Sequence, residues 1–159
     1  MKPTSFVLNI DQEGKVPVAE FQTLPKHGIY IMSHGAEVIR IGECSSGVAR
    51  LKKGFRDPMR RILRGKERKN YIAYSWRDSY KGEAVKVDYF ELLDPRFADA
   101  LFRRALEAEI TFQFRLARRA WPSQMSEIHF LERFRNDPQI IQLVTSILRH
   151  YHVTFDDKA

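Results

Sequence analysis

Residues 28–42, which read GIYIMSHGAEVIRIG, decide the fold of this 159-residue chain. Two apolar runs, 28–32 and 38–42, flank a polar segment that contains a glycine, and this pattern is typical of a β-hairpin. If the isoleucines of both runs share the core face, Ile31 lies opposite Ile39 and residues 34–36 form the loop. Tyr30 then lies directly across from Arg40, with both side chains on the same face.

The rest of the chain predicts further strands and helices around this hairpin. Strand-like runs occur at 6–10, 16–21, 71–76 and 85–90. Helix starts are predicted at Ser45 or Ser46, Asp57-Pro58, Asp94-Pro95 or Asp99, Ser126-Glu127, and Asp137-Pro138. We therefore expect an α+β fold, with a small, mainly antiparallel central sheet, helices packed around it and a helical C-terminal part.

Length and composition favour one domain with its own apolar core. A chain of 159 residues, 43% of them apolar, can bury a sizeable core without disulfides. We divide it into an N-terminal extension packing on the core (1–26), the central domain (27–124) and a C-terminal helical extension of the same domain (125–159). One cysteine, no signal peptide and no apolar run of about 20 residues predict a cytoplasmic protein without a membrane partner, either a monomer or a homodimer.

The positive charge of the chain is concentrated in one segment. Residues 50–69 contain ten Lys or Arg and two acidic residues, a net charge of +8, which leaves −1 for the rest of a chain whose total is +7. A solvated helix face is one interpretation of such a run. Its concentration favours a surface that contacts nucleic-acid phosphates, and the candidate residues are Lys52, Lys53, Arg56, Arg60, Arg61 and Arg64.

One carboxylate interrupts the apolar stripe of the long helix predicted to end near residue 120. Glu109 lies three or four positions from Ala105 and Phe112, whereas Glu107 shares its face with arginines and is predicted to be solvated. A carboxylate in a core-facing position needs a cationic partner. Glu109 is therefore either half of a buried salt bridge, for example to Arg50, or a metal ligand.

These residues resemble the GIY-YIG nuclease superfamily over about residues 27–124. Gly28-Ile29-Tyr30 matches the first motif, Arg40-Ile41-Gly42 matches the second except at its tyrosine, and Arg50 stands where the helix arginine falls. Residues 105–112, ALEAEITF, are similar to the family's helix motif Ala-Leu-x-x-Glu-x-x-apolar. This alignment selects Glu109 over Glu107.

The resemblance implies an endonuclease that hydrolyses DNA phosphodiester bonds with one Mg²⁺ or Mn²⁺; RNA as a substrate stays open. Glu109 would bind the metal, Tyr30 would be the general base, and Arg50 would stabilise the phosphate. A phenol has a pKa of about 10, so a base of this type needs a nearby cation. We expect Arg40, placed across the hairpin, to supply that charge.

Two departures from the family pattern suggest alternatives. Arg40 stands in place of the second tyrosine, and Gly54 stands one helical turn after Arg50, where relatives often have His or Tyr. They favour, as a second hypothesis, a catalytically impaired nucleic-acid-binding module of the same fold. A third hypothesis is a protein-interaction domain whose basic segment meets an acidic partner.

Overall fold

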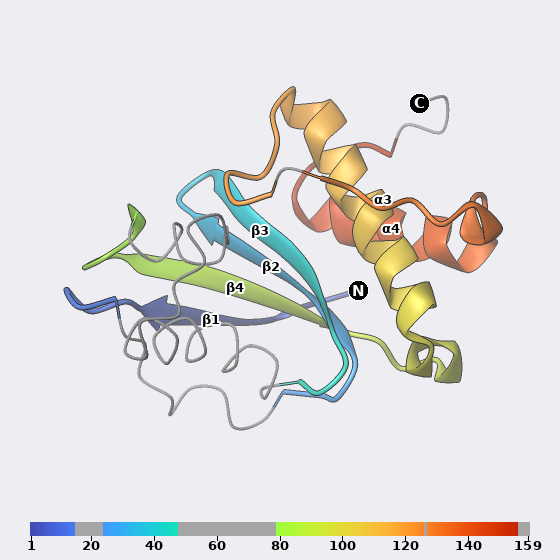
Figure 1. Cartoon of the computed structure of the whole chain (residues 1–159), viewed down its shortest axis with the longest axis horizontal. Coiled ribbons are helices and arrows are strands. Elements are labelled where there is room, and N and C mark those ends of the chain that lie inside the picture. The colour runs from blue at the N-terminus through green and yellow to red at the C-terminus, as the bar shows by residue number, and fades with distance from the viewer. Residues whose placement is uncertain (15–23, 48–78, 126, 156–159) are drawn as a thin grey trace, which may run out of the picture.

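The computed structural model describes residues 1–14, 24–47, 79–125 and 127–155, and in these ranges the chain has an α+β fold (Figure 1). Four antiparallel strands form one sheet in the order β1-β4-β2-β3. The strands are β1 (Thr4–Asn9), β2 (Gly28–His34), β3 (Glu37–Cys44) and β4 (Ala84–Glu91). The predicted α+β class with an antiparallel sheet is thus confirmed, and β1 lies beside β4 as an outer strand of the described sheet.

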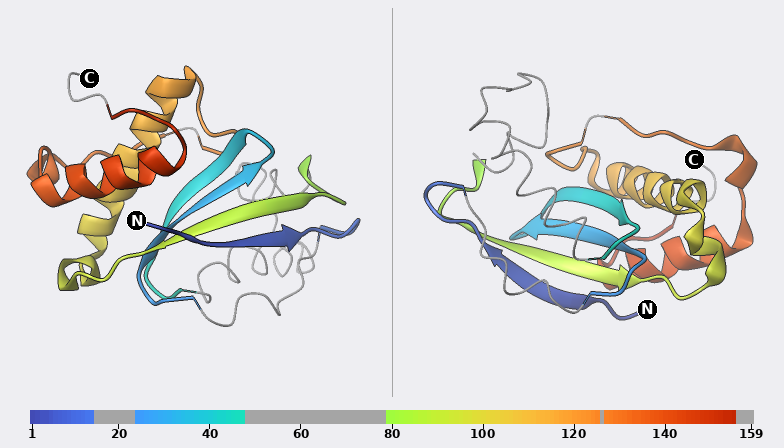
Figure 2. Two further views of the ribbon diagram at one scale, coloured as in Figure 1. Left: turned by 180° about the vertical axis from the view of Figure 1, so that it is seen from behind. Right: turned by 60° about the horizontal axis from the view of Figure 1, so that its bottom comes forward.

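Two helices, α3 (Ala100–Arg118) and α4 (Pro138–His150), lie on the same side of the sheet (Figures 1 and 2). Asp99 caps α3 by accepting a hydrogen bond from Leu101 N, and Asp137 caps α4 by accepting from Gln139 N and Ile140 N. Asp94 does the same for a short 3₁₀ helix, η2 (Pro95–Ala98). Both candidate caps of the long helix are therefore used, one for each consecutive helix.

The first face of the sheet packs against α3 and α4. Ile29, Ile31 and Ile41 form one core cluster with apolar residues of both helices, among them Leu106 and Val144. This cluster accounts for the periodic apolar stripes of the two helices, because each stripe faces the sheet or the other helix.

A buried carboxylate links the C-terminal end of α4 to β1 and β4. Asp88 on β4 is fully buried and accepts hydrogen bonds from Ser5 Oγ (2.5 Å) and Tyr151 Oη (2.7 Å), and Lys86 Nζ lies 3.0 Å away. Burial alone raises the pKa of Asp88, but the hydrogen bonds from Ser5, Tyr151 and Lys86 outweigh it and lower the pKa below its usual value. This carboxylate has a structural role.

The second face of the sheet is also buried. Tyr30, Met32 and Ile39 belong to a second cluster with Val87 and Tyr89 of β4. Because side chains alternate along a strand, Tyr30 points away from the side that carries α3 and α4. The sheet therefore separates the ring of Tyr30 from the core of that helical layer.

The predicted strands of the hairpin are present, but the predicted register is wrong. Ile31 lies opposite Ile41, and Tyr30 lies opposite Gly42. The turn is only Gly35-Ala36, with Gly35 at φ 55°, and an irregularity between Met32 and Ser33 adds an extra residue to β3. This bulge shifts Ile39 to the second face, so the four isoleucines do not share one side.

One predicted helix is absent, and several other predicted elements lie outside the described residues. No helix begins at Glu127: within the described part, residues 127–131 have no regular structure, and only a 3₁₀ turn, η3 (Glu132–Phe134), follows. The predicted elements at 16–21, 45–63 and 71–76 lie wholly or largely outside the described residues. Among the described helices, none is both long and apolar enough to span a membrane.

Candidate active site at the outer edge of β3

The hydroxyl of Tyr30 lies over β3. A Cβ atom added at Gly42 would come within 2.3 Å of Tyr30 Oη, so the ring occupies the space that a side chain at position 42 would need. Gly28 has the same relation to Tyr89, whose ring a Cβ at position 28 would meet at 2.3 Å. Both glycines of the hairpin motifs are therefore explained by tyrosine rings that cross them.

Glu107 reaches the residue next to Gly42. Its Oε2 accepts a hydrogen bond from Glu43 N at 3.2 Å, across the outer edge of β3. The side chain is half-buried and also lines a cavity of about 270 Å³ beside α3. The hydroxyl of Tyr30 and the carboxylate of Glu107 thus contact consecutive residues of one strand.

Arg103 holds α3 against the same end of β3. Its guanidinium is 3% exposed and donates from Nε to Glu43 Oε2 at 2.7 Å. It also donates to the carbonyl oxygens of Phe97 and Ala98, which end η2. This buried guanidinium donates three hydrogen bonds, which fix the position of α3 relative to η2 and β3.

His27 lies beside this ion pair, immediately before β2. Its Nδ1 atom is buried without a hydrogen-bond partner among the described residues. Burial lowers the pKa of His27 below its ordinary value, and the charges of Arg103 and Lys26 lower it further. The carboxylate of Glu43 opposes this lowering with a smaller effect.

Glu109 lies on the opposite side of α3. Residues two apart on a helix point about 200° apart, so Glu107 and Glu109 cannot both face β3. Glu109 accepts a hydrogen bond from Gln113 Nε2 at 2.9 Å and lines a cavity between α3, η3 and α4. The residues that line this cavity with Glu109 do not include Tyr30, which belongs to the cluster on the second face of the sheet.

The other predicted site residues are placed only in part. Arg40 lies opposite Met32, whereas Tyr30 lies opposite Gly42, two residues further along β3. The predicted direct pairing of Arg40 with Tyr30 is therefore absent. Arg50 and the basic candidates Lys52, Lys53, Arg56, Arg60, Arg61 and Arg64 lie outside the described residues. Arg50 follows the end of β3 by six residues in the sequence.

The carboxylate of Glu107 fits a hydrated divalent metal. Within the described ranges, no three His, Cys, Asp or Glu side chains are close enough together to form a metal site. Mg²⁺ needs fewer protein ligands, because it binds through one or two carboxylates and keeps several waters. Glu107 offers one carboxylate beside a cavity that has room for such waters.

Sequence reasoning missed Glu107, Arg103 and His27. The predicted solvent exposure of Glu107 is wrong because β3 is the outermost strand at this end of the described sheet, and its outward N–H needs an acceptor. One signal was available: Arg103 and Glu107 are four residues apart, which places them on one face of a helix.

The comparisons with known proteins give no relative for this chain. No protein-family model, no curated protein and no solved structure matches it. The argument for function therefore rests on the residues and the geometry given above.

Proposed function

We propose that this protein is a metal-dependent endonuclease of the GIY-YIG type, with Glu107 in place of Glu109 as the metal-binding carboxylate. One observation carries the proposal: Tyr30 Oη lies over Gly42, and Glu107 hydrogen-bonds to Glu43 N. The phenol and the carboxylate expected of such a site therefore contact consecutive residues of β3, Gly42 and Glu43.

Each residue has a role that its chemistry supports. Tyr30 would accept a proton from the attacking water, a step that a positioned base accelerates by roughly 10²–10⁴. Arg50 would bind the non-bridging phosphate oxygens through its planar guanidinium. A bound Mg²⁺ or Mn²⁺ would supply charge that stabilises the leaving oxygen, and Glu107 would hold it.

The described residues also support a nucleic-acid partner. Arg115, Arg118 and Arg119 are exposed at the C-terminal end of α3. No acidic residue occurs between positions 110 and 126. The guanidinium of Arg115 lies 4.3 Å from the ring centre of Trp121, which gives a flat surface beside the charges. These arginines extend the basic segment 50–69 as candidate phosphate contacts.

Cleavage assays with matched variants test the proposal. Supercoiled, linear and branched DNA are incubated with the pure protein and Mg²⁺ or Mn²⁺. We expect the wild type to nick at least one substrate, and Tyr30→Phe and Glu107→Gln to reduce the rate at least 100-fold. Glu109→Gln should change it less than threefold.

DNA affinity measured for the same proteins separates chemistry from binding. We expect all four to bind DNA alike and to lose affinity steeply with salt, because phosphate contacts release counterions. If Glu109→Gln abolishes cleavage while Glu107→Gln does not, the assignment of the metal-binding carboxylate is wrong. If binding does not weaken with salt, an acidic protein partner becomes the better hypothesis.

A second candidate function is nucleic-acid binding without cleavage. Two observations favour it: Arg40 stands in place of the second tyrosine, and the Tyr30 residue is only 7% exposed. In that case wild type, Tyr30→Phe and Glu107→Gln bind DNA equally and none of them nicks any substrate.

A further inference from the structure

The cavity that contains Glu109 has the features of a small-ligand site. Its volume is about 360 Å³, at the lower end of the roughly 300–1,000 Å³ usual for ligand pockets. It lies between α3, η3 and the first turn of α4, and none of the residues in the proposed nuclease function lines it. This inference is therefore independent of that function.

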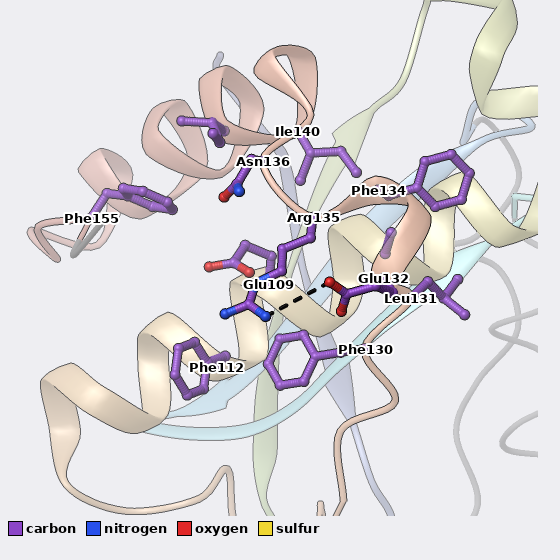
Figure 3. A pocket seen from close by; sticks show the side chains of 12 residues that line it. Glu109, Phe112, Phe130, Leu131, Glu132, Phe134, Arg135, Asn136, Ile140 and Phe155 are labelled. Atoms are coloured by element: carbon purple, nitrogen blue, oxygen red, sulfur yellow. Dashed lines mark ion pairs between the residues drawn. The ribbon is translucent and has the colours of Figure 1, made fainter. Parts of the chain in front are cut away.

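Aromatic side chains form much of the wall. Phe112, Phe130, Phe134 and Phe155 all line the cavity, and the rings of Phe112 and Phe130 meet edge to face with centres 5.3 Å apart (Figure 3). Phe130 is 55% exposed, although a large aromatic side chain normally gains from burial. An occupant of the cavity would cover part of that ring.

Among the described residues that line the cavity, carboxylates outnumber cations, because Glu109 and Glu132 are acidic and Arg135 is basic. At the rim, Arg135 Nη1 lies 3.8 Å from Glu132 Oε1, and these two exposed charges offset each other (Figure 3). Glu109 is the second carboxylate of the cavity wall. The partner that the structure gives it is the neutral amide of Gln113, itself 2% exposed, which orients the carboxylate without neutralising it.

We propose that this cavity binds a small organic cation: an ammonium, amidinium or guanidinium group carried on an aromatic or aliphatic body. The cationic group pairs with Glu109, and the body contacts the phenylalanine rings. Aromatic walls stabilise such a ligand in two ways: they bury its apolar part, and their π faces attract its positive charge. A carboxylate ligand would instead meet the negative charge of Glu109.

Benzamidine is the probe, with benzyl alcohol and benzoate as a neutral and an anionic comparison of similar shape. Binding is measured by isothermal titration, and ¹⁵N NMR shifts locate it. We expect saturable benzamidine binding at least tenfold tighter than either comparison compound, with the largest shifts at Phe112, Phe130 and Asn136. Equal or tighter binding of benzoate, or no saturable benzamidine binding, overturns the proposal.

Variants test the charge and the wall separately. Glu109→Gln should weaken benzamidine binding at least tenfold, and Phe130→Ala, at an exposed position that does not support the core, should weaken it at least threefold. The matched control is Glu83→Gln, which removes an exposed carboxylate outside the cavity and should change the affinity less than twofold. A Glu109→Gln protein that folds normally and still binds benzamidine at wild-type affinity contradicts the proposal.

Two further measurements exclude other occupants. Arg135→Gln should leave the benzamidine affinity unchanged or raise it; a tenfold loss would mean that Arg135 holds the ligand, and the cation assignment would be wrong. Adding Mg²⁺ should not displace benzamidine. Competitive displacement would instead make Glu109 a metal ligand, in agreement with the family pattern and against this proposal.

Discussion

The two sides of α3 carry carboxylates only two residues apart, and the surroundings of these carboxylates differ. On the side facing β3, Glu107 accepts a backbone N–H and the adjacent Arg103 forms a buried ion pair with Glu43. On the other side, Glu109 faces phenylalanine rings and a neutral amide. The role of a carboxylate on this helix therefore depends on the residues that lie next to its side of the helix.

The largest expected effect on stability comes from the ion pairs of the two sides. Arg103→Met leaves the carboxylate of Glu43, 16% exposed, without its partner, and should lower the free energy of unfolding by about 3–5 kcal/mol. Arg135→Met breaks an exposed pair and should change that free energy by less than about 0.5 kcal/mol. Urea unfolding measures both.

Equal losses for the two variants would remove the contrast. A small loss for Arg103→Met would mean that the ion pair does not fix α3 against β3. A large loss for Arg135→Met would mean that the rim of the cavity is a structural element and not an open mouth.

A smaller effect is expected at Gly42. Gly42→Ala forces a methyl group against the ring of Tyr30 and should cost about 1–3 kcal/mol of stability. In a Tyr30→Leu background the same change should cost much less, because the obstructing ring is absent. This double-mutant cycle tests whether the ring of Tyr30 lies over Gly42, the residue next to the one that Glu107 contacts.

A cost for Gly42→Ala that is the same in both backgrounds would show no coupling between positions 30 and 42. The proposed placement of Tyr30 and Glu107 at consecutive residues of β3 would then lose its basis. Tyr30→Leu also changes the packing of the second cluster, so the double mutant is compared with the Tyr30→Leu single mutant.

The smallest expected effect is a pH dependence at His27. Because the folded state lowers the pKa of His27, the unfolded chain binds a proton more readily, and stability should fall as the pH drops below about 6.5. That contribution is present in full above pH 6.5 and lost once the pH is below the folded pKa. In His27→Gln, the slope of the unfolding free energy between pH 5 and 7 should be shallower than in the wild type.

An unchanged slope in His27→Gln would mean that His27 titrates alike in the folded and unfolded chain. Burial of the His27 ring would then not affect the pH dependence of stability. His129→Gln, which removes a histidine whose side chain is 79% exposed, controls for the loss of one histidine.

Much of the fold could be predicted from local sequence signals. β-Branched and aromatic runs located β1, β2, β3 and β4, and aspartates before the helices located the starts of α3 and α4. These signals act within a few residues of the feature they determine, which is why they can be read from one sequence.

The hairpin register could not be predicted in this way. Assigning all four isoleucines to one face is the simplest use of a period of two, but the extra residue in β3 moves Ile39 to the other face. Both faces of this sheet are buried, so an isoleucine on either face satisfies the apolar pattern. Periodicity alone therefore could not detect the bulge.

For the candidate site, the sequence proposes Tyr30 and Glu109. The choice between Glu109 and Glu107 depends on which residues α3 faces, and this is a matter of tertiary packing. The sequence places Glu109 within an apolar stripe, and the structure shows that this part of the stripe lines a cavity. The sequence alone could not show that β3 would be the outermost described strand, with an N–H at Glu43 that needs an acceptor.

The most direct test asks whether Glu107 binds the proposed divalent metal. Mn²⁺ added at low ratio to ¹⁵N-labelled protein weakens the NMR signals of nearby amides. We predict that the amides of Glu43 and Ala108, beside the Glu107 carboxylate, lose intensity first, and that Glu107→Gln abolishes this loss. First losses at Phe112 and Asn136, which persist in Glu107→Gln and vanish in Glu109→Gln, would contradict the account.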